Sequence, residues 1–332
     1  MTDSRKTRPT AKSKRSPVAR AGEDEERSIF EKLYADWIPL HDRRPSTLYH
    51  YTTALGLLGI IQSNRLWASN ARFLNDSSEI AYAVDVVREA ITWVTKNYPV
   101  PLPSDFSNQL GQDLAAFEAE ARVYVCCFCS AGDLLSQWRG YGAQGGGYAI
   151  GFDTKGLGDR EVANPPRPIL RRVVYDPETQ QRLVRTWLQA VCDVAAAGRE
   201  AEADARSKLR SRLNALISTF TMLLSEFLIC FKNPAYVEEQ EWRLIQFGRV
   251  DGKEIIKPVF RAAGGRIIAY TTLDITKKMG EHKGRLPIQG IRFGPTLDLK
   301  TTQRSLRLLL EAAGYTPDRV GIESSLIPFS SA

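Results

Sequence analysis

The stretch EEQEWRLI, residues 238–245, concentrates acidic side chains at the start of an apolar run. Glu238, Glu239 and Glu241 lie within four residues, and the run that follows has the pattern of a strand. On a strand, Glu239 and Glu241 would share a face about 7 Å apart, so both could reach one ligand. One carboxylate could then bond a substrate hydroxyl while the other polarises a nucleophile. A surface ladder of these glutamates with Arg243 explains the same residues equally well.

His50 is the one histidine in a strand-like context, within STLYHYTT at residues 46–53. A period of two places Leu48, His50 and Thr52 on one face of that strand. His50 and Thr52 would then offer two hydrogen-bonding groups to a ligand. A buried histidine bonded to a backbone carbonyl is the alternative interpretation.

A third candidate group surrounds the glycine run at residues 145–147. Trp138 and Tyr141 could stack on a ligand, and Arg139 could meet a phosphate. A packed aromatic corner is the alternative. The chain contains no Walker loop, no dinucleotide-binding fingerprint after a strand, no HExxH and no GxSxG elbow, so none of those chemistries is indicated.

Charge is distributed unevenly along the 332 residues, whose formal net charge is +7. Residues 1–22 hold seven Lys or Arg and one Asp, so this tail carries +6 and the remaining chain only +1. The tail has few large apolar residues, which predicts disorder. It could bind polyanions weakly, although a solubilising leader explains it as well.

The cysteines indicate a reducing, cytoplasmic environment. Five of them, an odd number, occur without the spacing of a disulfide framework. Cys126, Cys127 and Cys129 fall in an apolar strand-like run, as core cysteines do. The longest apolar run, residues 216–231, is shorter than the ~20 residues of a spanning helix and contains Glu226, so no membrane segment is predicted.

The elements that must position these residues follow from hydrophobic periodicity and from turn residues. Helices are predicted over 27–39, 54–64, about 79–96, 106–121 and 301–314, with a helical block over 177–231. Strands are predicted over 46–53, 65–70, 123–130, 147–153, 171–175, 241–248, 257–261, 266–275 and 288–294. Asn75 and Asp76 are expected to cap the helix that follows them.

This order predicts an α+β fold whose mixed sheet is assembled from both ends of the chain. We expect a disordered basic tail at 1–26 and a single domain at 27–332, with a helical insertion at about 177–231. In the insertion, Phe220 and Phe227 belong to an apolar series with steps of three and four, so one side should face a core.

Several of these runs resemble a bacterial domain-of-unknown-function family, number 2971. They include LYHYTT, LGIIQSNRLWASNARFLNDSSE, LLSQWRGYG, FKNPAYVEEQEWRLI and IRFGPT, and the resemblance extends over roughly residues 46–330. The family label names no reaction.

A more distant resemblance is to the ADP-ribosyltransferase superfamily. The chain has a strand with His-x-Thr, a helix, a short strand and a late strand that opens with Glu-x-Glu. The resemblance implies that His50 and Thr52 hold the nicotinamide ribose of NAD. It implies that Glu241 stabilises an oxocarbenium-like transition state and that Glu239 activates the acceptor. Arg243 would keep the two glutamates ionised.

The aromatic residue that would stack on nicotinamide is left open among Phe73, Tyr82 and Tyr141. The implied function is NAD-dependent transfer of ADP-ribose to an unknown protein or nucleic acid, an activity that could serve a toxin, an effector or a phage-defence protein. NAD would be a substrate, and no metal is expected.

Two other functions compete with this one. The first is a metal-dependent phosphoesterase or nuclease, whose oxygen ligands would be Asp76, Glu79, Asp133, Glu239 and Glu241. The second is a non-catalytic binding module whose acidic strand and basic tail contact partners.

Overall fold

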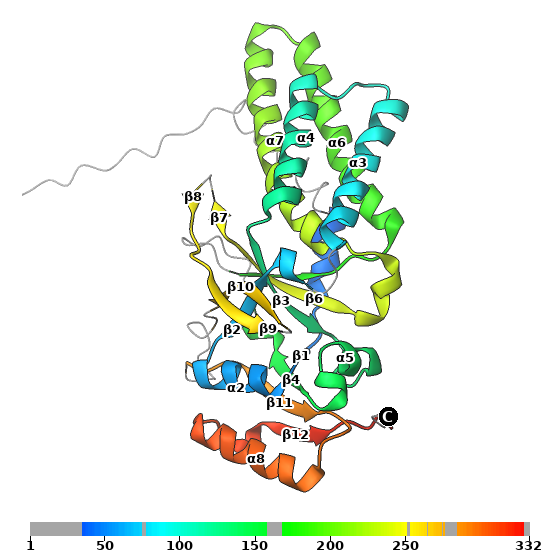
Figure 1. Cartoon of the computed structure of the whole chain (residues 1–332). Helices are drawn as coiled ribbons and strands as arrows, with labels where there is room; N and C mark the ends of the chain where they lie inside the picture. The colour runs from blue at the N-terminus through cyan, green and yellow to red at the C-terminus, as the bar shows by residue number, and fades with distance from the viewer. Residues whose placement is uncertain are drawn as a thin grey trace, which may run out of the picture.

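The computed structural model describes residues 35–74, 78–157, 168–250, 253–263, 265–273, 275 and 284–328. Within these ranges, ten strands form one mixed sheet, and helices cover both of its faces and extend above it (Figure 1). The α+β class is therefore confirmed. The basic tail at 1–26, Asn75 and Asp76 lie outside the described residues.

The sheet runs in the order β12-β11-β4-β1-β3-β2-β10-β9, with β6 paired to β3 and β5 paired to β6. Only β11 and β12 pair in parallel among its described ladders. The strands are β1 (Thr47–Thr52), β2 (Leu66–Asn70), β3 (Val123–Cys129), β4 (Tyr148–Asp153), β5 (Ile169–Arg172), β6 (Glu241–Phe247), β9 (Val259–Ala263), β10 (Arg266–Leu273), β11 (Ile288–Phe293) and β12 (Gly321–Ser324). A separate ribbon joins β7 (Arg249–Val250) to β8 (Lys253–Glu254).

Both ends of the chain contribute to this sheet, as the sequence predicted. Late strands β11 and β12 extend it beyond β4, and late strands β9 and β10 extend it beyond β2. The early strands β1, β2 and β3 therefore lie in the middle, where they are flanked on both sides.

Strand β3 has a forked edge. On one side it pairs with β6 along its whole length. On the other side it pairs first with β2, where Ser69 is opposite Val125, and later with β1, where Tyr49 is opposite Cys129. Between these contacts, residues 126–128 have no ladder partner on this side among the described strands. The fork opens the middle of the sheet to side chains.

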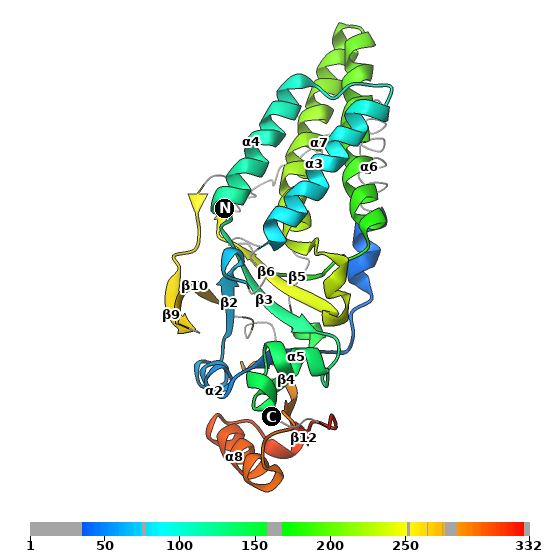
Figure 2. The same cartoon turned by 45° about the vertical axis from the view of Figure 1, so that its right-hand side comes forward.

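Four helices form a bundle that stands on one side of the sheet (Figures 1 and 2). They are α3 (Glu79–Asn97), α4 (Ser104–Glu120), α6 (Pro177–Glu200) and α7 (Ala203–Cys230). The predicted insertion at 177–231 supplies α6 and α7, and the segment between β2 and β3 supplies the other two. Phe220 and Phe227 are fully buried in this bundle, so the predicted core face of α7 is confirmed.

The core of the bundle continues into the sheet without a break. Val123 and Val125 of β3 and Ile245 of β6 are buried in one cluster with residues of all four helices. The bundle is therefore anchored on the sheet through apolar packing, which is the dominant stabilising contribution in folded proteins.

Helix α7 also meets the length and composition expected of a membrane span over Ala205–Cys230, the one helix in the described part of the chain to do so. Half of the window tested is buried within the protein. The core helix of a soluble bundle has the same composition, and the absence of a membrane segment stays a prediction.

The remaining helices cover the rest of the sheet. Helices α2 (Ala54–Ser63) and α8 (Leu299–Ala312) bury Leu57 and Leu310 against a second core. The short α5 (Leu135–Gly140) covers the opposite face, where Trp138 packs on Tyr51 with ring centroids 4.8 Å apart. The sheet is thus enclosed by α2 and α8 on one face and by α5 and the bundle on the other.

One predicted boundary was wrong. Residues 35–42 are helical, so the first helix does not end at Pro39. Trp37 and His41 lie one turn apart, and their rings are in contact with centroids 4.2 Å apart. Both residues are buried, and His41 accepts a hydrogen bond from the backbone nitrogen of Arg172. These tertiary contacts hold the helix together beyond the proline.

Candidate active site

A small cleft lies where β1, β3 and β6 meet α5 and the turn before β6. About 60 Å³ of it is open to water. Its lining residues are Tyr49, His50, Tyr51, Cys127, Phe128, Cys129, Gln137, Tyr141, Glu239 and Glu241. Four of the predicted site residues, His50, Tyr141, Glu239 and Glu241, are therefore brought together from distant parts of the chain.

His50 is placed at the fork in the sheet. Its Nδ1 lies 2.8 Å from the carbonyl oxygen of Cys127, within the unpaired part of the β3 edge. A carbonyl can only accept, so the ring proton is on Nδ1 and Nε2 is left as an acceptor. Burial lowers the pKa of His50, so its imidazole is neutral at physiological pH. A neutral ring with a fixed tautomer is suited to accept a hydrogen bond from a ligand hydroxyl.

Glu241 is the first residue of β6 and is only 5% exposed. Arg243 binds it bidentately, from Nε to Oε1 at 2.8 Å and from Nη2 to Oε2 at 2.9 Å. Although burial opposes ionisation, the charges of Arg243 and Lys232 lower the pKa of Glu241 to about 2. The carboxylate is therefore ionised, as predicted from the position of Arg243.

Lys232 bridges the two glutamates of the Glu-x-Glu motif. Its Nζ lies 2.5 Å from an oxygen of Glu239 and 2.9 Å from an oxygen of Glu241. The lysine is almost fully buried, and the nearby carboxylates raise its pKa above the usual value despite that burial. It is therefore charged and neutralises part of the acidic cluster.

The prediction that Glu239 and Glu241 share a strand face was wrong. Glu239 ends the short helix η4 (Pro234–Glu239), and β6 begins only at Glu241. Gln240 between them has a left-handed backbone with φ of 45°, which turns the chain sharply. Lys232, rather than strand alternation, holds the two carboxylates together.

A third carboxylate completes the cluster from the bundle. Glu79 at the start of α3 is 5% exposed and forms an ion pair with Arg243. Its other oxygen lies 3.9 Å from Nζ of Lys232. Burial raises the pKa of Glu79, and the negative charge of Glu241 acts in the same direction. The cluster thus contains three carboxylates and two cations.

Tyrosine hydroxyls border the cluster on the cleft side. Tyr141 donates a hydrogen bond of 3.3 Å to Glu239, and Tyr175 accepts one of 3.0 Å from the backbone nitrogen of Glu241. Burial and the nearby carboxylates raise the pKa of both phenols, so both remain neutral. Of the three candidate stacking aromatics, Tyr141 is the one that lines the cleft.

The other predicted binding residues do not line this cleft. Phe73 ends the exposed turn η1 (Ala71–Phe73), and Tyr82 bonds Gln180 within the bundle at 2.8 Å. Arg139 is exposed on α5. The hydroxyl of Thr52 lies against Gly56 at the start of α2. Strand alternation placed Thr52 beside His50, but the strand ends there and the chain turns into the helix.

Of the ligands named for the metal-dependent alternative, Glu79, Glu239 and Glu241 meet in the cluster, and Asp76 lies outside the described residues. Asp133 lies away from the acidic cluster, where it accepts hydrogen bonds from Trp138, Ser325 and the backbone of Leu326. No group of three or more His, Cys, Asp or Glu side chains in the described ranges is arranged to hold a metal ion. Within the cluster, ammonium and guanidinium groups occupy the positions between the carboxylates.

Sequence reasoning missed three contributors to the site. Lys232 directly follows the predicted helical block, and a lone lysine inside LICFKNPAY is a signal of a paired buried charge that could have identified it. Cys127 was assigned to the core, yet its side chain is half-buried in the cleft and its thiol bonds Glu241. Burial raises the pKa of that thiol well above its usual value, so it is protonated. Gln137 lines the cleft from α5, and no sequence feature marked it.

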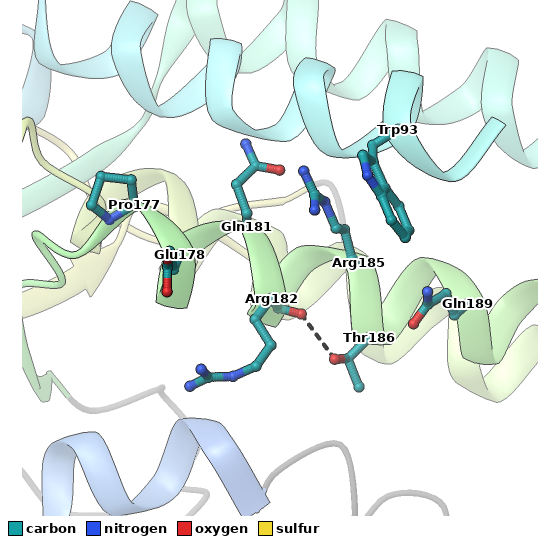
Figure 3. A pocket seen from close by; sticks show the side chains of 8 residues that line it. All are labelled: Trp93, Pro177, Glu178, Gln181, Arg182, Arg185, Thr186 and Gln189. Carbon is teal, nitrogen blue, oxygen red and sulfur yellow. Dashed lines mark hydrogen bonds between the residues drawn. The ribbon is translucent and has the colours of Figure 1, made fainter. Parts of the chain in front are cut away.

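A larger groove lies on the outside of the bundle between α3 and α6 (Figure 3). It encloses about 570 Å³ and is lined by polar and charged side chains of α6 together with Trp93. There Arg185 lies over the Trp93 ring at 4.4 Å, and Arg182 pairs with Asp36 at 3.2 Å. None of the predicted site residues lies in this groove.

The low pKa of Glu241 predicts how stability should depend on pH. A carboxylate with a lower pKa in the folded state stabilises the fold above its ordinary pKa of about 4.5. This contribution, on the order of 3 kcal/mol, should be lost as pH falls from about 4.5 to about 2. Urea unfolding across that range should show a steeper loss in the wild type than in Glu241→Gln. Parallel curves would contradict the assignment.

Comparison with known proteins gives one match. Residues 137–244 match a family model described as "Protein of unknown function (DUF2971)". The match supports the family resemblance found in the sequence and spans the segment from α5 into β6, which includes Tyr141, Lys232, Glu239 and Glu241. No curated protein and no solved structure matches the chain.

Proposed function

We propose that this protein is an ADP-ribosyltransferase-like enzyme that cleaves the bond between nicotinamide and ribose in NAD. ADP-ribose would then pass to a protein or nucleic-acid acceptor. The observation that carries the proposal is the meeting of His50, Tyr141, Glu239 and Glu241 in one cleft. These are residues to which the sequence resemblance assigns roles in NAD chemistry, and they come from separate elements of the chain.

Cleavage of this bond develops positive charge on the ribose. A fixed carboxylate beneath that charge, in a site that excludes water, is the kind of preorganised group that contributes most to catalysis. Glu241 meets these conditions because it is ionised, almost fully buried and held by two hydrogen bonds from Arg243.

The balance of charge in the cluster also favours a cationic transition state. Glu79, Glu239 and Glu241 carry three negative charges when ionised, against two positive charges on Lys232 and Arg243. One negative charge is then in excess next to the cleft. Arg243 and Lys232 favour the ionised form of Glu241 without fully neutralising the field that the ribose would experience.

Glu239 is placed to act on the acceptor. It is half-buried, whereas Glu241 is buried, and it ends η4, whose other residues are exposed. An acceptor approaching over η4 would meet Glu239 before Glu241. A nucleophile activated by Glu239 would therefore attack the ribose from the open side of the cleft.

His50→Ala should weaken NAD binding by about 10-fold, because one hydrogen bond to the ribose is lost. Thr47→Val is a matched control on the same strand, since the Thr47 hydroxyl bonds Gln289 outside the cleft. Calorimetric titration with NAD should separate the two variants. Equal affinities in His50→Ala and the wild type would remove His50 from the binding site.

The proposal as a whole is tested by incubating the purified protein with labelled NAD and cell lysate. Label should be scored separately in protein, nucleic acid and free ADP-ribose, and nicotinamide release should be measured in parallel. Absence of both NAD binding and nicotinamide release would overturn the proposal. A melting temperature raised by Mg²⁺ and not by NAD would favour the metal-dependent alternative instead.

A further inference from the structure

Arg261 on β9 is a half-buried cation that forms no ion pair with any of the described carboxylates. Its guanidinium lies 5.6 Å from the ring centroid of Trp67 and 5.7 Å from that of Tyr270. Nη2 donates to the hydroxyl of Ser69 at 2.9 Å, and the buried Nε has no hydrogen-bond partner. In the described part of the chain, no carboxylate forms an ion pair with it.

Strand register fixes the sheet face on which Arg261 lies. Arg261 is opposite Ile268 on β10, and Tyr270, two residues further, is opposite Ser69 on β2. Residues opposite one another share a face, and so do residues two apart. Arg261, Tyr270 and Ser69 therefore project from the same face of the sheet.

The same rule connects this face to the candidate active site. Ser69 is opposite Val125 on β3, and Cys127, two residues further, is opposite Arg243 on β6. Arg243 in turn shares its face with Glu241. Arg261 and Glu241 thus project from one face of the sheet, on opposite sides of the fork in β3.

By the same rule, the side chain of His50 leaves β1 on the other face of the sheet, because the neighbouring Tyr49 is opposite Cys129, which shares its face with Cys127. The ring of His50 occupies the fork through its bond to Cys127, and it lines the cleft that contains Glu241. Ser69, which accepts a hydrogen bond from Arg261, is opposite Val125, two residues before the Cys127 whose carbonyl His50 bonds. After burial, the positive charge of Arg261 is a further cause of the lowered pKa of His50. A ligand that bonds His50 would therefore have the carboxylates on one side and Arg261 on the other.

We propose that Arg261 binds a phosphate group of the ligand that occupies this cleft, so that the ligand crosses the fork from Glu241 past His50 to β9. This inference rests on the proposed function for the identity of the ligand, the diphosphate of NAD. Placing a guanidinium in a half-buried position costs free energy unless an anion compensates it. The N–H groups of a guanidinium are arranged to bond two oxygens of one phosphate group, and Nε of Arg261 has no hydrogen-bond partner.

Packing holds this arginine in place before any ligand arrives. The Trp67 ring lies against α2 at Gly59, where a β-carbon would come within 2.4 Å of the indole. Trp67 and Tyr270 contact one another with ring centroids 5.4 Å apart. Cation–π contacts with both rings then favour the orientation of a guanidinium that has a single polar partner.

The test compares ligands with and without phosphate groups. Binding of NAD, ADP-ribose, inorganic pyrophosphate and nicotinamide riboside should be measured by calorimetry on the full chain. Arg261→Gln should bind NAD, ADP-ribose and pyrophosphate about 10–100-fold more weakly, the scale of one charge-assisted contact. Its affinity for nicotinamide riboside, which has no phosphate, should be unchanged. Arg266→Gln is the matched control, because Arg266 is exposed at the start of β10.

The outcomes separate this inference from the proposed function. If NAD binds and Arg261→Gln binds it as tightly as the wild type, the phosphate site is overturned and the function stands. If pyrophosphate binds in an Arg261-dependent way and NAD does not, the phosphate site stands and the function falls. Arg261→Lys keeps the charge and should retain most of the pyrophosphate affinity if Arg261→Gln fails to fold. Equal loss in Arg266→Gln would show only a general effect of surface charge and would overturn the site.

Discussion

Glu241→Gln should reduce nicotinamide release at saturating NAD by about 10²–10³-fold while leaving NAD affinity nearly unchanged. The substitution keeps the shape of the side chain and removes the charge beneath the ribose. A charge that acts mainly in the transition state lowers the rate of the chemical step and has little effect on ground-state binding. The measurement is single-turnover nicotinamide release, with affinity determined separately by calorimetry.

Glu238→Gln is the matched control for this prediction. Glu238 belongs to the same acidic stretch, but it is exposed and accepts a hydrogen bond of 3.2 Å from Ser136, away from the buried cluster. It should retain wild-type turnover. Because Glu241 also belongs to the buried cluster, the melting temperature of each variant must be measured, and turnover compared where both are folded. Full activity in folded Glu241→Gln would exclude Glu241 from the mechanism.

Arg243→Met should destabilise the fold by about 3–5 kcal/mol, because it leaves two buried carboxylates without their shared cation. Arg243 is 1% exposed, binds Glu241 through two nitrogens and pairs with Glu79. It also donates to the carbonyl of Ile229 at the end of α7. Methionine has a similar volume, so the loss should be electrostatic rather than a cavity effect. Urea unfolding at neutral pH gives the magnitude.

Arg171→Met provides the comparison, since Arg171 lies directly opposite Arg243 across β5 and β6. It pairs with a single buried carboxylate, Glu226, and is itself partly exposed, so its loss leaves one carboxylate unpaired instead of two and should cost less than the loss of Arg243. The deficit of Arg243→Met should also shrink as pH falls below 4.5, because protonation of the carboxylates in the variant removes the unpaired buried charge while the wild type loses the stabilisation from ionised Glu241. A deficit that stays constant with pH would indicate lost packing instead.

Much of the fold could be predicted because the periodicity of the sequence is clear where elements bury one face. The helix predicted over 54–64 and the strand over 147–153 agree with α2 and β4 to within a residue. The partners of each strand could not be predicted, because the sequence of a strand does not show which distant strand pairs with it. Nothing in β3 indicates that β1 and β2 share its edge, because that arrangement depends on where the intervening helices lead the chain.

The candidate site shows the same limit. His50 and Glu241 could be identified by residue type, because a polar side chain within or next to an apolar strand is conspicuous even without related sequences. Strand alternation failed for Glu239, because the left-handed Gln240 interrupts the strand it assumed. It also gave no indication of Lys232, which reaches both carboxylates from the end of a helix. Counter-ions that come from other elements depend on the tertiary structure, so a local sequence pattern cannot predict them.

The position of the bundle relative to the acidic cluster has a practical consequence. Glu79 begins α3 and Lys232 follows α7, so both helical insertions end at the residues that set the charge of the cleft. A version of the protein trimmed to its sheet would lose two of the five ionic groups along with the helices. The bundle therefore supplies part of the ionic cluster on which the proposed reaction depends. A molecule that binds the far end of the bundle and shifts its helices could also move Glu79 and Lys232 relative to the cleft.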